Sequence, residues 1–170
     1  MKTKPAIFIA LLVTSSLSFA GGGTKELDHS NDQNAHEIKN QESNELMKGL
    51  DSQAAKTVMA FHKAINSGNG KQAREYLDDA IVIFEGGGVE RSADQYASHH
   101  MLSDMSFLKE LDITTLEHQV KVDGNMAVSM SRSHMQGAFK GKEIDIKSME
   151  TMVLKKVSEQ WKIIHIHWSN

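Results

Sequence analysis

The sequence predicts an α+β fold in which three N-terminal helices pack on a curved antiparallel sheet. Apolar residues recur at helical spacing between about residues 51 and 111, whereas from 115 onward they alternate with polar residues, as in half-buried strands. Turn sequences at 123–125, 140–142 and 158–160 divide this second half into four strands. Helices followed by a strand meander form two layers around one core.

The first half contains three predicted helices and one predicted strand. Ser and Asp residues that can cap helix N-termini precede the first and third helical stripes, and a Gly-containing turn ends the first. A run of β-branched residues lies between the second and third helices and predicts a strand. The elements are a helix from Asp51 to the turn at 67–70, a short helix holding Ala73, Tyr76 and Leu77, a strand Ala80–Glu85, and a helix from Ser92 to about Leu111.

Four strands make up the second half, and the orientation of one of them is left open. They are Thr115–Val122, Met126–Gly137, Ile144–Val157 and Trp161–Ser169. In the second of these, Arg132 and His134 share one face, while Ser129, Ser131 and Ser133 share the other. Either face can line the interior, the first as an anion clamp and the second as a wall of small residues.

Composition excludes several classes of function. The 170 residues include no cysteine, which excludes disulfides, thiolate metal sites and cysteine nucleophiles. The net charge of −3 has the wrong sign for broad contact with nucleic-acid phosphates. We therefore expect no nucleic-acid partner.

The N-terminal segment predicts export. Lys2 and Lys4 precede the apolar run Ala6–Val13, and Ser18-Phe19-Ala20 is a small-x-small cleavage sequence. The apolar run is shorter than the roughly 20 residues of a membrane-spanning helix. We expect a signal peptide at 1–20, a polar flexible lead-in at 21–49 and a folded domain at 50–170. The mature chain would carry a net charge of −5, be periplasmic or secreted, and have no membrane attachment after cleavage.

Two local sequences carry a resemblance to a known family. One is the turn Ser67-Gly68-Asn69 with Leu77-Asp78-Asp79-Ala80 leading into a strand, and the other is the W-x-I-x-H-x-H-x-S ending at 161–169. Together with the element order, they resemble the nuclear transport factor 2-like superfamily, in its SnoaL-like and ketosteroid isomerase-like branch. The resemblance implies a cone with a deep pocket between the helices and the concave sheet face, and frequently a dimer through the outer sheet face.

The third predicted helix carries candidate site residues on an apolar stripe. At 100° per residue, His100 and Asp104 fall among inward residues such as Met101 and Leu108, one helical turn from each other. A carboxylate beside an imidazole suits a general base or a metal ligand. Tyr96 joins this set as a candidate ligand-binding residue. The alternative is a helix turned so that both ionisable groups lie at its margin.

Two acidic residues occupy strand positions that alternation assigns to the interior. Glu150 shares a face with Ile146 and Met152, and a buried carboxylate needs a proton, a cation or a hydrogen-bond donor. Glu85 ends a strand on the face of its isoleucines, beside three glycines. The simpler interpretation of Glu85 is a rim residue in a turn.

The closing strand carries two histidines at alternating positions. His165 and His167 share a face with Ile163, whereas Ile166 and Trp168 share the other. Paired histidines on a strand can converge on a divalent metal, to which His100 could add a third ligand. The alternative role of the pair is structural hydrogen bonding. His62 and His118 lie alone on apolar stripes, where a satisfied core histidine is the simpler interpretation.

Three hypotheses about function follow. The first is a noncatalytic binding domain that holds a small organic ligand or a metal ion among Tyr96, His100, Asp104, Glu150, His165 and His167. The second is an acid/base enzyme of the isomerase or dehydratase type, with Asp104 or Glu150 as the base and His100 or His165 as its partner. It ranks lower because the sequence shows no obvious Tyr-plus-acid oxyanion pair. The third is assembly as a homodimer through the outer sheet face, which Ile164, Ile166 and Trp168 would form.

Overall fold

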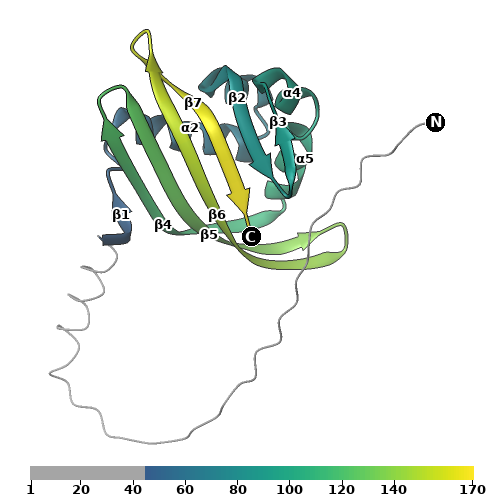
Figure 1. Cartoon of the computed structure of the whole chain (residues 1–170). Helices are drawn as coiled ribbons and strands as arrows, with labels where there is room; N and C mark the ends of the chain where they lie inside the picture. Colours follow the sequence, from purple (N-terminus) through teal and green to yellow (C-terminus); the bar gives the residue numbers. More distant parts are fainter. Residues whose placement is uncertain (1–44) are drawn as a thin grey trace, which may run out of the picture.

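The computed structural model of the chain describes residues 45–170, which form one seven-stranded sheet with helices against it (Figure 1). The expected signal peptide at 1–20 and most of the lead-in at 21–49 lie outside the described residues. The strand order is β1-β4-β5-β6-β7-β2-β3. No helix in the described part of the chain combines the length and apolar content needed to cross a membrane.

The first two predicted helices are present. Helix α2 spans Gln53–Asn66 and α3 spans Gly70–Tyr76. The side chain of Ser52 accepts a hydrogen bond from the Ala55 amide, and that of Asn69 accepts one from the Gln72 amide. Both caps satisfy amides that a helix N-terminus leaves without an internal partner.

The expected long third helix is wrong, because the structure breaks it in two. Helix α4 spans Ala93–Ser98 and α5 spans Met101–Leu108, so residues 45–170 contain four helices rather than three. The Ser98 hydroxyl donates to the carbonyl oxygens of Asp94 and Gln95. A serine that bonds back to carbonyls of its own turn competes with helix continuation. His99 caps α4 with φ −117° and ψ −76°, and its amide donates to the carbonyl oxygen of Tyr96, three residues back.

The four predicted strands form an antiparallel meander, as expected. They are β4 (Leu111–Asp123), β5 (Met126–Phe139), β6 (Lys142–Val157) and β7 (Gln160–Ser169), each antiparallel to the next.

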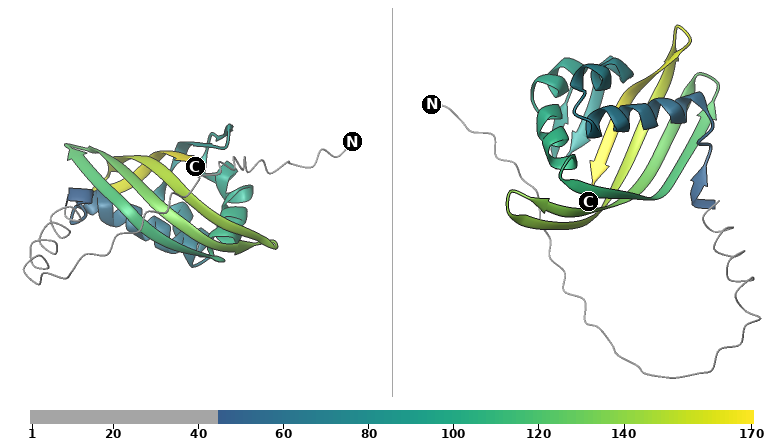
Figure 2. Two further views of the ribbon diagram at one scale, coloured as in Figure 1. Left: turned by 90° about the horizontal axis from the view of Figure 1, so that it is seen from below. Right: turned by 180° about the vertical axis from the view of Figure 1, so that it is seen from behind.

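Three further strands extend this meander at its edges. Strand β2 (Leu77–Glu85) runs parallel to β7 and forms a hairpin with β3 (Gly88–Glu90), and β1 (Met47–Lys48) pairs in parallel with β4. The sheet curves around α2 (Figure 2). Helix α4 contacts β2 and β3, and α5 contacts α2, α4 and β4.

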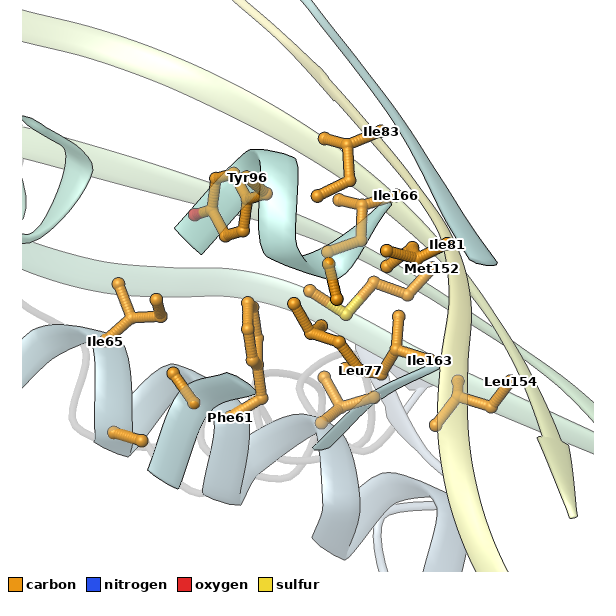
Figure 3. Close-up of a cluster of buried hydrophobic side chains, with 14 of the residues drawn as sticks. Phe61, Ile65, Leu77, Ile81, Ile83, Tyr96, Met152, Leu154, Ile163 and Ile166 are labelled. Atoms are coloured by element: carbon orange, nitrogen blue, oxygen red, sulfur yellow. The ribbon is translucent and has the colours of Figure 1, made fainter. Parts of the chain in front are cut away.

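The hydrophobic core lies between α2 and the concave face of the sheet (Figure 3). It also contains the buried face of α4, including Tyr96, which is 1% exposed. Fully buried members of the core are Ala54, Ala55, Val58, Ala73, Ile81, Ala93, Met152, Leu154, Ile163 and Ile166. Burying large side chains such as Ile166 and Met152 contributes about 1.5–3 kcal/mol each.

A β-bulge in β7 reverses the expected orientation of the closing strand. Leu154 pairs with Ile163, but the next residue back, Val153, pairs with His165, so Ile164 is the extra residue. A bulge shifts the two-residue alternation by one position. Ile163 and Ile166 are therefore both fully buried, and the residues that follow the bulge face opposite to the sequence prediction.

The open orientation of β5 is also defined. Ser129 is fully buried and pairs in register with Met152, and Ser131 pairs with Glu150 on the same face. The serine set therefore faces the interior, and the face of Arg132 is the outer one. Arg132 contacts Glu117 there, with 3.4 Å between nitrogen and oxygen.

Candidate functional site

Polar residues in register across five strands form a row on the inner face of the sheet, here called the inner-face row. His118 of β4 pairs with Ser131 of β5, which pairs with Glu150 of β6. Glu150 pairs with Trp168 of β7, which pairs with Glu85 of β2. Paired residues of adjacent strands project from the same face of a sheet. The neighbouring row contains Val120, Ser129, Met152, Ile166 and Ile83, all buried.

Glu150 is the centre of a hydrogen-bonded group in this row. Its carboxylate accepts hydrogen bonds from His62 Nε2 at 2.9 Å, from Trp168 Nε1 at 2.8 Å and from Ser131 Oγ at 3.3 Å. The Glu150 side chain is 9% exposed, and that of His62 is 37% exposed. His62 comes from α2, so the group joins the helix layer to the sheet.

The charges in this group stabilise one another. Burial raises the pKa of Glu150, but His62, the Trp168 indole and His118 together outweigh burial and hold that pKa below its usual value. Burial lowers the pKa of His62, and the Glu150 carboxylate reverses this effect, so the net shift is upward. Burial and the charge of His62 lower the pKa of His118, which donates to or accepts from Ser129 Oγ at 2.9 Å.

A second hydrogen-bonded group lies next to Trp168 of the inner-face row. The Tyr96 hydroxyl of α4 donates to Asp104 Oδ2 of α5 at 2.8 Å. Burial raises the pKa of Asp104 despite that hydrogen bond, and burial next to Asp104 raises the pKa of Tyr96. The ring centroids of Tyr96 and Trp168 are 6.0 Å apart, so the two groups share an aromatic contact. The structure therefore contains a Tyr-plus-acid pair that the sequence did not reveal.

Two more carboxyl groups lie near Asp104. Glu90 of β3 is 5% exposed and pairs with His100 Nδ1 at the start of α5. Glu85 lies at the exposed end of β2, where desolvation of its carboxyl group and the Asp104 charge raise its pKa to about 7. A carboxyl pKa close to neutrality is typical of functional sites.

The structure brings together four of the residues predicted from sequence and separates the others. Tyr96, Asp104 and Glu150 lie along the inner face, and His100 lies beside them. However, His100 pairs with Glu90 rather than with Asp104, because the helix break moves it to the N-cap of α5.

His165 and His167 lie on the outer face of the sheet, contrary to the expected pocket orientation. The bulge in β7 is the physical reason. His165 Nδ1 donates to the carbonyl oxygen of Val82 at 2.7 Å, and both rings pack edge-on against Phe84. Within residues 45–170, no three His, Asp or Glu side chains are arranged to hold a metal ion. The histidines at 100, 165 and 167 therefore do not form the expected metal site.

Sequence reasoning missed three residues of the site. His62 follows Phe61 on the apolar stripe of α2, and spacing alone could not show that Glu150 lies opposite it. Glu90 lies in a three-residue strand that was not predicted. Trp168 was assigned to the outer face, and only the register of β7 against β6 corrects this.

Comparisons with known proteins agree with this architecture. The family model of the SnoaL-like domain matches residues 55–170. A crystal structure from Shewanella frigidimarina, provisionally described as a ketosteroid isomerase, is 50% identical over 72% of this chain and 99% of its own, with a TM-score of 0.71. No curated protein matches the chain.

More distant solved structures share the fold alone. A structure from Streptomyces avermitilis is provisionally described as a dehydratase of the NTF2-like family. It is 15% identical to this chain, covers 69% of this chain and 93% of its own, and has a TM-score of 0.58. The association domain of C. elegans CaMKII is also 15% identical, with 83% and 100% covered and a TM-score of 0.55. The fold is thus of the nuclear transport factor 2-like class. Within that class, this chain belongs to the family of SnoaL-like domain proteins.

Proposed function

We propose that the protein binds a small organic molecule against the inner-face row. The observation that carries this proposal is the register of His118, Ser131, Glu150, Trp168 and Glu85 across five strands. The row beside it is apolar apart from Ser129, and packing alone does not require this row's buried carboxylate and histidine, whose desolvation costs free energy. Concave sites that combine aromatic surface with a few converging polar groups are typical of small-molecule binding.

Thermal unfolding with a panel of small molecules tests this proposal. A molecule that binds only the folded state stabilises it by about 2.7 kcal/mol at a concentration of 100 times its Kd. We expect at least one molecule to raise the unfolding temperature, and Glu150→Gln to weaken its binding at least tenfold. Glu143→Gln is the matched control, because Glu143 is exposed on the same strand. Binding that Glu150→Gln leaves unchanged, or no binding by any molecule, contradicts the proposal.

A second candidate function is proton transfer at the same site. It is favoured by the raised pKa values of Glu85 and Asp104 beside the Tyr96 hydroxyl. A base is most effective when its pKa is near the working pH. The Tyr96 hydroxyl, held beside Asp104, could donate a hydrogen bond to a carbonyl oxygen as negative charge develops on it. The provisional description of the Shewanella frigidimarina relative as a ketosteroid isomerase supports this candidate.

Isomerisation of a β,γ-unsaturated ketone tests the second candidate. The base would take the proton between the carbonyl and the alkene and return it to the γ-carbon, which yields the conjugated ketone without net gain or loss of atoms. We expect kcat/KM to rise with pH through about 7 if Glu85 is the base, and Glu85→Gln to abolish the rise. The doubly substituted Glu85→Gln, Tyr96→Phe protein should lose turnover, because it lacks both the base and the hydroxyl donor. Unchanged turnover in that protein would eliminate this mechanism.

We also propose that the protein forms a homodimer through the outer sheet face, with different residues from those expected. Phe84 and Met149 are 44% and 51% exposed on this face, whereas Ile166 is buried and the Trp168 indole bonds the inner Glu150. The similarity to an association domain is compatible with assembly. Light scattering should give a dimer mass for the mature chain and a monomer for the Phe84→Glu, Met149→Glu variant. Leu102→Glu, on α5 and 67% exposed, is the control that should stay dimeric.

Export is proposed from the sequence of residues 1–20. Expression of the full sequence in a bacterial host should yield a periplasmic or secreted protein whose mass corresponds to a start at Gly21. A cytoplasmic protein that retains Met1–Ala20 would contradict this expectation.

A further inference from the structure

Asp104 lies close enough to two other carboxyl groups, those of Glu85 and Glu90, for their charges to interact. Asp104 accepts the Tyr96 hydrogen bond, and the charge of Glu90 contributes to the upward shift of the Asp104 pKa, after burial. Asp104 in turn contributes to the upward shift of the Glu85 pKa, again after burial. The three groups come from β2, β3 and α5, so the fold itself gathers them at one end of the inner-face row.

The described residues supply little positive charge to these carboxyl groups. His100 pairs with Glu90, and its side chain is 61% exposed. Among the hydrogen bonds and ion pairs of residues 45–170, no Lys or Arg contacts Glu85, Glu90 or Asp104. One imidazole therefore faces three carboxyl groups, and the cluster lacks positive charge.

Glu90 provides an independent indication of a missing partner. Its Oε2 atom is buried and has no hydrogen-bond partner among the described residues, while the residue is 5% exposed. Buried polar atoms almost always have a partner, and an unsatisfied one costs about 1–3 kcal/mol, more if it is charged. The other oxygen already binds His100, so Oε2 requires a separate N–H or O–H donor.

Aromatic surface adjoins the carboxyl groups. Tyr96 and Trp168 have ring centroids 6.0 Å apart with an interplanar angle of 44°, and Trp168 is partly exposed. An organic cation gains from aromatic faces as well as from carboxylates. A bare metal ion is a poorer match, because no three His, Asp or Glu side chains within residues 45–170 are arranged to hold one.

From this geometry we infer that the site takes organic cations, namely molecules with a protonated amine whose N–H groups bind Asp104 and Glu90. The apolar part of such a molecule would lie against Trp168, which is the partly exposed ring of this pair. This inference rests on the proposed binding function and adds the chemical class of the ligand.

Three probes of matched shape and different charge test the inference. Benzylammonium, benzyl alcohol and benzoate are titrated into the wild-type protein at pH 7.5, with calorimetry as the measurement. We expect benzylammonium to bind at least tenfold more tightly than benzyl alcohol, and benzoate to bind more weakly than either. Glu90→Gln and Asp104→Asn should each remove most of the preference for the ammonium group. Asp112→Asn, an exposed acid on β4, should leave it intact.

The outcomes separate the inference from the proposed function. Equal binding of benzylammonium and benzyl alcohol, or tighter binding of benzoate, overturns the cationic class while the binding function stands. No binding of any probe overturns the cationic class, and the wider panel then decides the binding function. The probe comparison uses wild-type protein, so it remains decisive even if a substituted protein fails to fold. A preference for benzylammonium that persists in both Glu90→Gln and Asp104→Asn also overturns the assignment.

Discussion

Replacing Glu150 with Gln should destabilise the protein in a pH-dependent way. The substitution keeps the size of the side chain and an oxygen that can accept the Trp168 hydrogen bond. It removes the negative charge that faces His62 at 2.9 Å in a position where the Glu150 side chain is 9% exposed. Hydrogen bonds to charged groups contribute about 1.5–3 kcal/mol each. Because the His62 side chain is 37% exposed and solvent screens part of the attraction, we expect a loss of about 2 kcal/mol.

The pKa shifts define the pH window of this loss. The pKa of Glu150 is lowered in the folded state, so its contribution is present above the unfolded value of 4.5 and is lost as the pH falls through the folded value. The pKa of His62 is raised, so its contribution is present below 6.5 and is lost as the pH rises through the folded value. Both contributions are complete between pH 4.5 and 6.5, and the destabilisation should be largest there.

Urea unfolding at pH 5.5 and 8.5 measures both the size and the window. We expect the Glu150→Gln protein to lose about 2 kcal/mol at pH 5.5 and less at pH 8.5, because His62 loses its charge as the pH rises through its raised pKa. Glu143→Gln should change the unfolding free energy by less than about 0.5 kcal/mol at either pH, as exposed substitutions usually do. A loss at Glu150 that is below 0.5 kcal/mol, or equal at the two pH values, would refute the charged pair.

Three further predictions concern Glu85, Gly137 and Tyr96. Glu85 keeps its proton up to about pH 7 in the folded protein, whereas the unfolded chain releases it near pH 4.5. The stability of the wild-type protein should therefore fall by about 1 kcal/mol between pH 4.5 and 7, a value that is discounted for solvent exposure. The urea midpoint of the Glu85→Gln protein should not show this fall. In Gly137→Ala, the new Cβ would lie 2.6 Å from the Glu110 carbonyl oxygen, and urea unfolding should show a loss of about 2 kcal/mol. Gly141 also has a positive φ, but a Cβ added there would have no atom within 4 Å, so Gly141→Ala should lower the unfolding free energy by only about 1 kcal/mol. Equal losses for the two substitutions would contradict the close approach at Gly137. Tyr96→Phe removes a hydrogen bond that lowers the Asp104 pKa, so carbon NMR titration should show a higher Asp104 pKa in the substituted protein. A lower Asp104 pKa would exclude the Tyr96–Asp104 hydrogen bond.

The features of the fold that follow from periodicity were predictable. Alternation between polar and apolar residues identified the β4–β7 meander. Two possible capping residues, Asp51 and Ser52, marked the start of α2, and the structure shows that Ser52 is the cap. The break between α4 and α5 was not predictable, because residues 98–101 contain no Pro or Gly to mark it. Short strands such as β1 and β3 contain too few residues to show a period.

The site was predictable only where it did not depend on register. Glu150 was assigned inward because β6 keeps a regular alternation along its length. His165 and Trp168 were placed on the wrong faces because one bulge residue, Ile164, shifts the alternation after it. Such a bulge is defined by pairing with β6, and no local pattern in β7 reveals it. The contacts His62–Glu150 and Glu90–His100 join residues 88 and 10 positions apart, which requires the tertiary structure.

The central claim is that a small organic molecule binds along the inner-face row, and the two tryptophans test it directly. Trp168 lies in the row, whereas Trp161 lies seven residues earlier on the same strand, about 23 Å away along an extended chain. Proton–nitrogen NMR resolves the two indole N–H signals, which are assigned with Trp161→Phe. Titration with benzylammonium or another binding molecule should shift the Trp168 signal and leave the Trp161 signal in place. A titration that shifts only Trp161, or neither signal at saturation, would contradict the claim.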